Sequence, residues 1–397
     1  GKSFWLATTN MAACLSPRAT QGVGGYDLPV IRVIDIGPSQ RGFTTIVRDS
    51  LPLSQKDKVI FKVMRMAKEF AINPFDTPLG SRTPTKLDEQ FLESFLCICA
   101  TSEKGELPDK MSDMIGQIVR SIYLKFSDKE RRNISPKEYQ IGMNNEVDMA
   151  LEKYEFKPKY WWNIVDFFKE KANFNGAYDD TLIRLAYIAQ RYAVPTMTDL
   201  ISYTNESIEN SYGAIKVNGQ PLLESFQTTI EALVTKYEVL AYPTEFDLGN
   251  SRIAVLDLQG VQGGTGASGD KQTTIMYMLA RFKMASEFYG SKDIINEFNP
   301  DYHDYHLPRL ERMSSTPKRL VFDEFHRTGS SKLMRQQIER DMREGRKFNI
   351  QIALASQSLA DFDDIYFELA SGVWIMGVGS NMDIDIAKKK LDLSDTA

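Results

Sequence analysis

Apolar residues follow two patterns along this 397-residue chain: short continuous runs, and positions three or four residues apart. The continuous runs are rich in β-branched residues and end at a polar or acidic residue, which is typical of strands buried on both faces of a parallel sheet. The predicted strands are 30–35, 253–258, 320–323, 350–357 and 372–377. Ligands bind such sheets at the carboxyl ends of the strands, where Asp35, Asp257 and Asp323 fall.

Residues 87–237 show the helical pattern almost throughout and lack β-rich alternation. We interpret this stretch as a helical domain inserted into an α/β core, whose two parts are 1–86 and 238–397. The expected fold class is therefore α/β, with a mostly parallel sheet and a large inserted all-α domain. The predicted helices of the insertion are 91–100, 110–126, 136–151, 160–171, 180–192 and 222–237.

The chain opens on Gly-Lys-Ser, followed by residues 4–13, which have helical spacing and contain no Gly or Pro. At the end of a phosphate loop, such a lysine contacts the β- and γ-phosphates and the serine hydroxyl contacts Mg²⁺. We therefore expect Gly1, Lys2, Ser3 and Phe4 to bind the phosphates of a nucleotide. The residues that complete the motif are expected upstream of Gly1, and a chance Gly-Lys-Ser is the alternative.

The predicted strand at 320–323 is followed by a second acid, so that Asp323 and Glu324 end an apolar run. In a nucleotide triphosphatase the first acid holds Mg²⁺ and the second polarises the attacking water. We assign these roles to Asp323, together with the hydroxyl of Ser3, and to Glu324. The expected cofactors are ATP and Mg²⁺, and the expected reaction is hydrolysis of ATP to ADP and phosphate.

A strongly charged helix predicted at 332–347 precedes the fourth strand. Most of its charges are typical of a solvated face. We expect Arg343 and Arg346, near its end, to lie at the level of the catalytic edge, at a rim that faces a neighbouring subunit. There they are candidates to neutralise charge on the transferred phosphoryl group, in their own subunit or across the interface. Gln357, at the end of the fourth strand, is either a polar residue at the surface or a contact to the water or the γ-phosphate.

Glycine-rich residues 260–269 predict a surface loop. A second phosphate loop at 264–271 is rejected, because Asp270 stands where a glycine should directly precede the lysine.

The charge balance excludes a global electrostatic footprint for nucleic acid. The chain has 48 basic and 53 acidic residues, a net charge of −5 and no long basic run. This argues against a nucleic-acid duplex as a direct ligand, although the net charge leaves a local basic pore as an alternative. Three cysteines without metal-binding spacing suit a reducing compartment. No apolar run is long enough for a membrane span and no signal peptide is evident, so we expect a cytoplasmic protein.

The order of motifs resembles the VirB-type ATPases of type IV secretion systems, and among them the type IVB (Dot/Icm) members. The motifs are Gly-Lys-Ser, the strand with Asp-Ile-Gly-Pro-Ser at 35–39, the helical insertion, Phe-Asp-Glu-Phe-His at 322–326 and Ala-Ser-Gln at 355–357. The resemblance implies a RecA-like P-loop core and a hexameric ring of like subunits. It also implies other secretion ATPases and inner-membrane channel components as partners, and a peripheral position on the cytoplasmic face of the inner membrane. The Phe-His after the acid pair departs from the usual family pattern.

Two alternative functions stay open at this stage. A DNA-pumping motor of the coupling-protein or FtsK/HerA type has the same core but needs a positively charged pore. A non-catalytic assembly platform binds nucleotide without hydrolysing it, and the intact pair of Asp323 and Glu324 argues against that interpretation.

Overall fold

The computed structural model describes residues 1–15, 28–102, 106–129, 134–328, 331–377 and 381–391. Contacts between residues divide the chain into two compact units. Unit 1 comprises Gly1–Arg65, Leu248–Gly290 and Met313–Ala397, and unit 2 comprises Met66–Asp247 and Ser291–Arg312. The stretch 87–237, which the sequence predicts to be an insertion, lies wholly inside unit 2.

Unit 1 is built on a five-stranded parallel sheet, which confirms the expected α/β class. The strand order is β2-β7-β1-β8-β9. The strands are β1 (Val30–Asp35), β2 (Val59–Val63), β7 (Ile253–Asp257), β8 (Lys318–Phe322) and β9 (Ile350–Leu354). Every residue of β1, β7 and β8 is buried, as the continuous apolar runs of these strands require.

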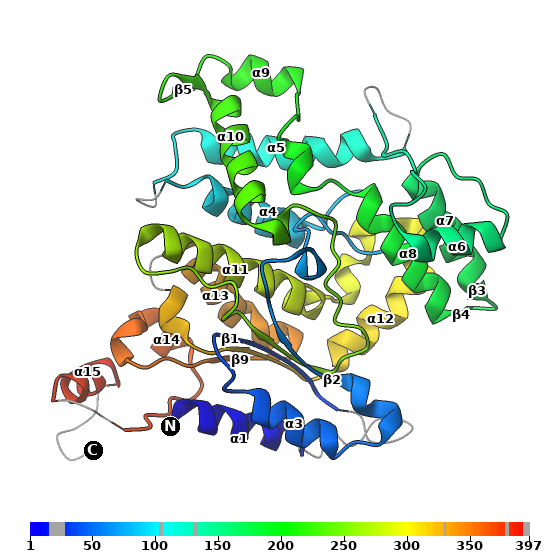
Figure 1. Ribbon diagram of the computed structural model, residues 1–397. Coiled ribbons are helices and arrows are strands. Elements are labelled where there is room, and N and C mark those ends of the chain that lie inside the picture. The colour runs from blue at the N-terminus through cyan, green and yellow to red at the C-terminus, as the bar shows by residue number, and fades with distance from the viewer. Residues whose placement is uncertain (16–27, 103–105, 130–133, 329–330, 378–380, 392–397) are drawn as a thin grey trace. The chain divides into compact units, whose positions relative to one another are not determined.

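Helices cover both faces of this sheet (Figure 1). On one face lie α1 (Lys2–Cys14) and α3 (Arg41–Asp49), and on the other lie α11 (Ala267–Ala285) and α13 (Lys332–Gly345). Two further helices, α14 (Asp364–Leu369) and α15 (Asn381–Leu391), follow β9. Leu6 and Cys14 of α1 pack with Phe43 of α3 against apolar residues of the sheet, so α1 is part of the core of this unit.

The sequence predicts four of the five strands, and the structure differs at two places. β2 is missed: it is an edge strand in which only Val59 is buried, and its apolar run is limited to three residues before Lys62. The predicted strand at 372–377 is wrong. In the described part of the chain this segment joins no sheet, and Val373, Trp374, Ile375 and Met376 are 38–63% exposed. Strand propensity alone is insufficient without a partner backbone.

Unit 2 is mainly helical. Its helices are α4 (Lys86–Ala100), α5 (Met111–Phe126), α6 (Asn145–Lys153), α7 (Trp161–Ala172), α8 (Asp180–Ala193), α9 (Glu206–Tyr212), α10 (Leu222–Lys236) and most of α12 (His303–Ser315). A core cluster joins α6, α7 and α8, with Trp161 stacked on Tyr192 at 4.6 Å between ring centroids. The apolar spacing of three and four residues seen in the sequence forms this core.

Two small hairpins show that unit 2 is not all-α. They pair β3 (Asn173–Phe174) with β4 (Ala177–Tyr178), and β5 (Lys216–Val217) with β6 (Gln220–Pro221). Each turn is an Asn-Gly pair, Asn175-Gly176 and Asn218-Gly219, and all four residues have positive φ. This backbone is the type I′ turn that joins two strands with a matching twist. The signal was therefore present in the sequence.

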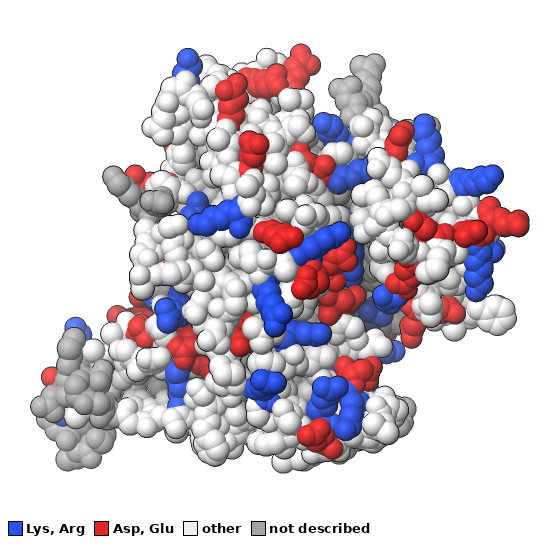
Figure 2. Space-filling view, viewed as in Figure 1, with Lys and Arg blue, Asp and Glu red and all other residues white. Residues whose placement is uncertain are grey.

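Charged side chains of both signs are interspersed over the face shown in Figure 2, without a broad area of one sign there. This agrees with the balanced composition. Among the described residues, no helix combines the length and the apolar character that crossing a membrane demands.

Candidate active site

Three buried carboxylates meet at one edge of the sheet of unit 1. Asp35 ends β1 and is paired in register with Asp257, which ends β7. Asp323 directly follows β8, and its backbone N–H donates a hydrogen bond to the carbonyl of Ile34 at 2.9 Å. Each carboxylate residue is at most 1% exposed. Parallel strands bring their carboxyl ends to the same edge, so residues far apart in sequence become neighbours here.

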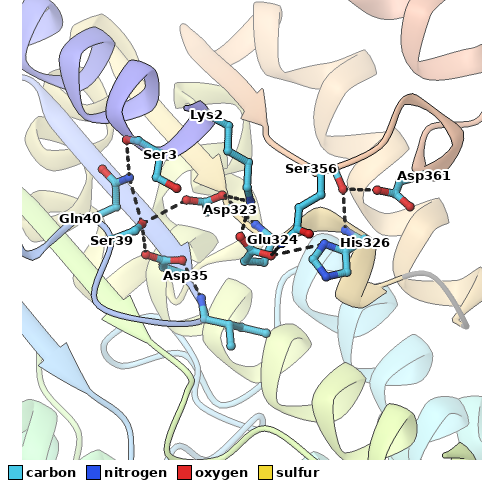
Figure 3. Close-up of polar contacts among 12 residues, drawn as sticks. Lys2, Ser3, Asp35, Ser39, Gln40, Asp323, Glu324, His326, Ser356 and Asp361 are labelled. Carbon is cyan, nitrogen blue, oxygen red and sulfur yellow. Dashed lines mark hydrogen bonds and ion pairs between the residues drawn. The ribbon is translucent and has the colours of Figure 1, made fainter. Parts of the chain in front are cut away.

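Lys2 connects the two parts of the predicted nucleotide site, the Gly-Lys-Ser segment and the acid pair (Figure 3). It lies in the first turn of α1, and its Nζ is 2.9 Å from Oδ1 of Asp323 and also pairs with Oε1 of Glu324. Burial alone would lower the pKa of Lys2, but the hydrogen bonds and charges of Glu324 and Asp323 outweigh it and the pKa is raised. The lysine is therefore a charged, partly buried donor at the carboxyl edge.

A buried polar network fixes α1 on the sheet. The side-chain amide of Gln40 donates to the carbonyl of Ser3 at 3.4 Å, and Asn10 donates to the Gln40 oxygen at 3.3 Å. Arg319 of β8 donates in turn to Asn10 at 2.8 Å. Gln40 and Asn10 are fully buried, so breaking one of these hydrogen bonds would leave a polar group with neither a protein partner nor water to bond to. The network sets the position of the first turn, which carries Lys2 and Ser3.

Ser39 bridges two of the three carboxylates. Its hydroxyl lies 2.6 Å from Oδ2 of Asp35 and 3.2 Å from Oδ2 of Asp323. Burial raises the pKa of Asp35 to about 7, the Ser39 hydrogen bond opposes this rise, and the charges of Asp323 and Asp257 add to it. The pKa of Asp35 therefore lies near neutral pH, and the Ser39 hydroxyl connects its carboxyl group to that of Asp323.

Glu324 is held in an unusual backbone conformation. Its φ is +54°, a region that non-glycine residues rarely adopt and that costs on the order of 1–3 kcal/mol. Its backbone N–H donates to Oδ1 of Asp323 at 2.9 Å, and the buried hydroxyl of Tyr277 donates to the Asp323 carbonyl. Strain of this kind is found at functional sites, where the surrounding contacts hold it in place.

The second carboxylate oxygen of Glu324 faces the end of β9. Nε2 of Gln357 donates to Oε2 of Glu324 at 3.1 Å, and Nδ1 of His326 lies 3.4 Å from the same oxygen. The structure thus brings Lys2, Glu324 and Gln357 together. Of the other residues predicted to bind the phosphates, Gly1 is the N-cap residue of α1, and Phe4 is 77% exposed.

The arginines do not lie where the sequence analysis expects them. A helix between neighbouring parallel strands runs back to the opposite edge, and α13 ends just before the first residue of β9. Asn349, three residues after Arg346, accepts a hydrogen bond from the N–H of Lys318, which begins β8. Arg343 pairs with Glu339 at 2.8 Å and is 54% exposed. The expected place of Arg343 and Arg346 beside the catalytic edge of their own subunit is wrong, and a role across a subunit interface stays a prediction.

The glycine-rich loop before α11 has a structural explanation. A Cβ at Gly263 would lie 2.1 Å from the carbonyl oxygen of Gly269, and a Cβ at Gly269 would lie 1.8 Å from that of Gly264. Only glycine allows this close approach of two backbones. Asp270 lies in the first turn of α11.

Several residues of the site escape sequence reasoning. Ser39, Gln40 and Tyr277 have no role in the sequence analysis, although Asp-Ile-Gly-Pro-Ser directly after a buried strand is a usable signal for the first of them. Gln40 contacts Ser3, 37 positions away, and Tyr277 contacts Asp323, 46 positions away, and local pattern carries no information about such contacts.

The residues present fit a magnesium nucleotide. Asp323 offers a buried carboxylate, and the hydroxyls of Ser3 and Ser39 are further hard oxygen donors at this edge. In the described residues, no set of three His, Cys, Asp or Glu side chains is arranged to hold a metal ion alone. Mg²⁺ bound with a nucleotide needs few protein ligands, because phosphate oxygens and waters complete its shell.

Replacing Asp35 with Asn is expected to stabilise the protein above neutral pH. The unfolded carboxyl ionises near pH 3.8 and the folded one near 7, so between these values only the folded state keeps the proton. Stability then falls as pH rises through this window, by up to about 1.4 kcal/mol per pH unit from this group. Thermal denaturation should show the Asn variant more stable than wild type near pH 8, by a smaller margin near pH 5, and similar to wild type only below about pH 4.

The control for this prediction is Asp49→Asn, which changes a carboxylate that is 69% exposed in the same unit. It should leave the pH dependence unchanged. An Asp35→Asn variant that is less stable than wild type near pH 8 would show that the folded protein stabilises the ionised carboxylate of Asp35. That result would contradict a raised pKa.

Comparisons with known proteins give limited information. No family model matches the chain, and no curated protein matches it either. Among solved structures, the chain is similar to that of VirB4 of Thermoanaerobacter pseudethanolicus. The two share 14% sequence identity, the alignment covers 100% of this chain and 79% of that chain, and the TM-score is 0.46. Identity and TM-score of this size do not establish a shared function.

Proposed function

We propose that this chain is the catalytic core of a P-loop ATPase that energises assembly or substrate translocation by a type IV secretion system. The observation that carries the proposed ATPase activity is the position of Lys2, whose ammonium group lies between Asp323 and Glu324 at the carboxyl edge of the sheet. The secretion role rests on the order of motifs, which resembles the VirB-type ATPases and among them the type IVB member DotO (IcmB).

The side chains divide the chemistry of ATP hydrolysis among them. Lys2 contacts the β- and γ-phosphates. Ser3 and Asp323 would hold Mg²⁺, which when bound would supply positive charge to the phosphate oxygens. Glu324 takes up the proton of the attacking water, and Gln357 orients its carboxylate through the hydrogen bond to Oε2. When phosphates replace the carboxylates as the partners of Lys2, Oε1 of Glu324 becomes available to the water.

The proposed working form is a hexameric ring. In it, Arg343 and Arg346 reach the site of the adjacent subunit, since within their own subunit they lie at the other edge of the sheet. The ring docks on other secretion ATPases and channel components at the cytoplasmic face of the inner membrane. The surface charges of the described residues are balanced on the face in view, which supports a protein rather than a nucleic-acid ligand.

The test is Mg²⁺-dependent release of phosphate from ATP by the full-length protein, with and without DNA. We expect turnover that needs Mg²⁺ and is unchanged by DNA. A rate that DNA raises severalfold would favour a DNA-pumping motor. Tight ATP binding without turnover, in the ring state as well, would favour a non-catalytic assembly platform.

A further inference from the structure

The carboxylate of Asp361 binds the loop after β9 on both sides of Gln357. Asp361 ends η10 (Leu359–Asp361), and its Oδ2 accepts hydrogen bonds from the hydroxyl of Ser356 and from the backbone N–H of Ser358 at 3.1 Å. These two serines flank Gln357 in the chain. One carboxylate therefore binds the side chain of the residue before Gln357 and the backbone of the residue after it.

The Ser356 hydroxyl links this loop to the segment that carries the acid pair (Figure 3). It donates to Asp361 and accepts a hydrogen bond from the backbone N–H of His326 at 3.2 Å, so its orientation is fixed on both sides. The backbone N–H of Phe325 donates to the carbonyl of Ala355 at 2.9 Å. The turn just after Glu324 is thus bonded residue by residue to the end of β9.

Aromatic packing supports the same junction. The ring of Phe325 stacks on that of Phe362 with centroids 5.1 Å apart and an angle of 6°, and it meets Tyr366 edge-on at 5.2 Å. Phe325 directly follows Glu324, and Phe362 directly follows Asp361. Packing and hydrogen bonding therefore restrict the same two segments.

The two oxygens of Glu324 are held by different partners. Oε1 pairs with Lys2, whereas Oε2 faces Gln357 and His326. Gln357 lies in the chain between the two serines that Asp361 binds, and the backbone N–H of His326 donates to one of them, Ser356. A nucleotide that engages Lys2 removes the first restraint only. Without the second restraint, a carboxylate on a strained backbone at φ +54° would be free to reorient.

We propose that Asp361 is a positioning residue for the reaction: through Ser356 and Ser358 it fixes Gln357 and His326, and through them the orientation of Glu324. This inference rests on the proposed ATPase function and adds a residue that does not touch the nucleotide. Its role is to keep the Glu324 carboxylate aimed at the attacking water after Lys2 has turned to the phosphates. Small misplacements of a reacting group are enough to lower a rate strongly.

The first arm of the test needs no nucleotide. Hydrogen–deuterium exchange of the full-length protein is measured over residues 323–328 for wild type, Asp361→Asn and the control Asp364→Asn, whose carboxylate residue is 86% exposed. We expect faster exchange in Asp361→Asn only. Equal exchange in all three proteins overturns the proposal, whether or not the protein hydrolyses ATP.

The second arm measures kcat, KM and ATP affinity. We expect Asp361→Asn and Ser356→Ala to lower kcat roughly tenfold with ATP affinity nearly unchanged, and Ser356→Thr, which keeps the hydroxyl, to restore most of the rate. In the Glu324→Gln background, Asp361→Asn should have no further effect, because it acts through Glu324. An equal loss in both backgrounds, or a loss that appears as weaker ATP binding, overturns the proposal.

Failure of the proposed function looks different from failure of this inference. If wild type hydrolyses no ATP although exchange responds to Asp361→Asn as expected, the ATPase assignment is wrong and Asp361 orders the turn for another purpose. If wild type hydrolyses ATP and Asp361→Asn equals wild type in both arms, only the positioning role is wrong.

Discussion

Lys2→Ala in the full-length protein is expected to abolish both ATP binding and turnover. The ammonium group is the cation that lies against Asp323 and Glu324, and its removal leaves two carboxylates facing the phosphates. Hydrogen bonds to charged groups are worth about 1.5–3 kcal/mol each, so losing the contacts to two phosphates predicts at least about 100-fold weaker binding. Titration with a fluorescent ATP analogue in the presence of Mg²⁺ measures this loss.

Two variants make the result specific. Lys62→Ala removes an exposed lysine of the same unit and should bind ATP like wild type. Lys2→Arg keeps the charge but changes the donor geometry, and should restore binding only in part. Tight ATP binding by a folded Lys2→Ala protein would remove Gly1, Lys2 and Ser3 from the phosphate-binding site.

The sheet could be predicted because its information is local. A strand buried on both faces is mostly apolar, and β1, β7 and β8, in which every residue is buried, carry such apolar runs. β9 is less buried but has a shorter run, Ile352 to Leu354. The same rule failed at 372–377, since pairing depends on a partner that no local pattern describes. The Asn-Gly turns of unit 2 were local signals too, but the helical pattern around them received more weight.

The site could be predicted only in part. Asp323 and Glu324 stand together in the chain, and their position after a strand identifies them. The bridge from Asp35 through Ser39 to Asp323 joins residues of β1 and β8 that only the strand order makes neighbours. The error on Arg343 has a different cause, because the direction of a crossover helix could have been inferred from the parallel strands themselves.

Glu324→Gln is expected to bind ATP normally and to hydrolyse it at least about 100-fold more slowly, which is the lower range for loss of a general base. Glutamine keeps the shape of the side chain and can still accept the hydrogen bond of Gln357, but it cannot take a proton from water. The protein should therefore accumulate with unhydrolysed ATP bound. Single-turnover measurement with radiolabelled ATP separates binding from the chemical step.

The control Glu368→Gln changes an exposed carboxylate of α14 in the same unit and should leave single turnover unchanged. Near-normal hydrolysis by Glu324→Gln would show that another group accepts the proton. Asp35 would then be the first candidate, because burial raises its pKa to about 7 and Ser39 connects it to Asp323. In that case Asp35→Asn, and not Glu324→Gln, would trap ATP, and the rate of wild type would rise with pH as Asp35 ionises.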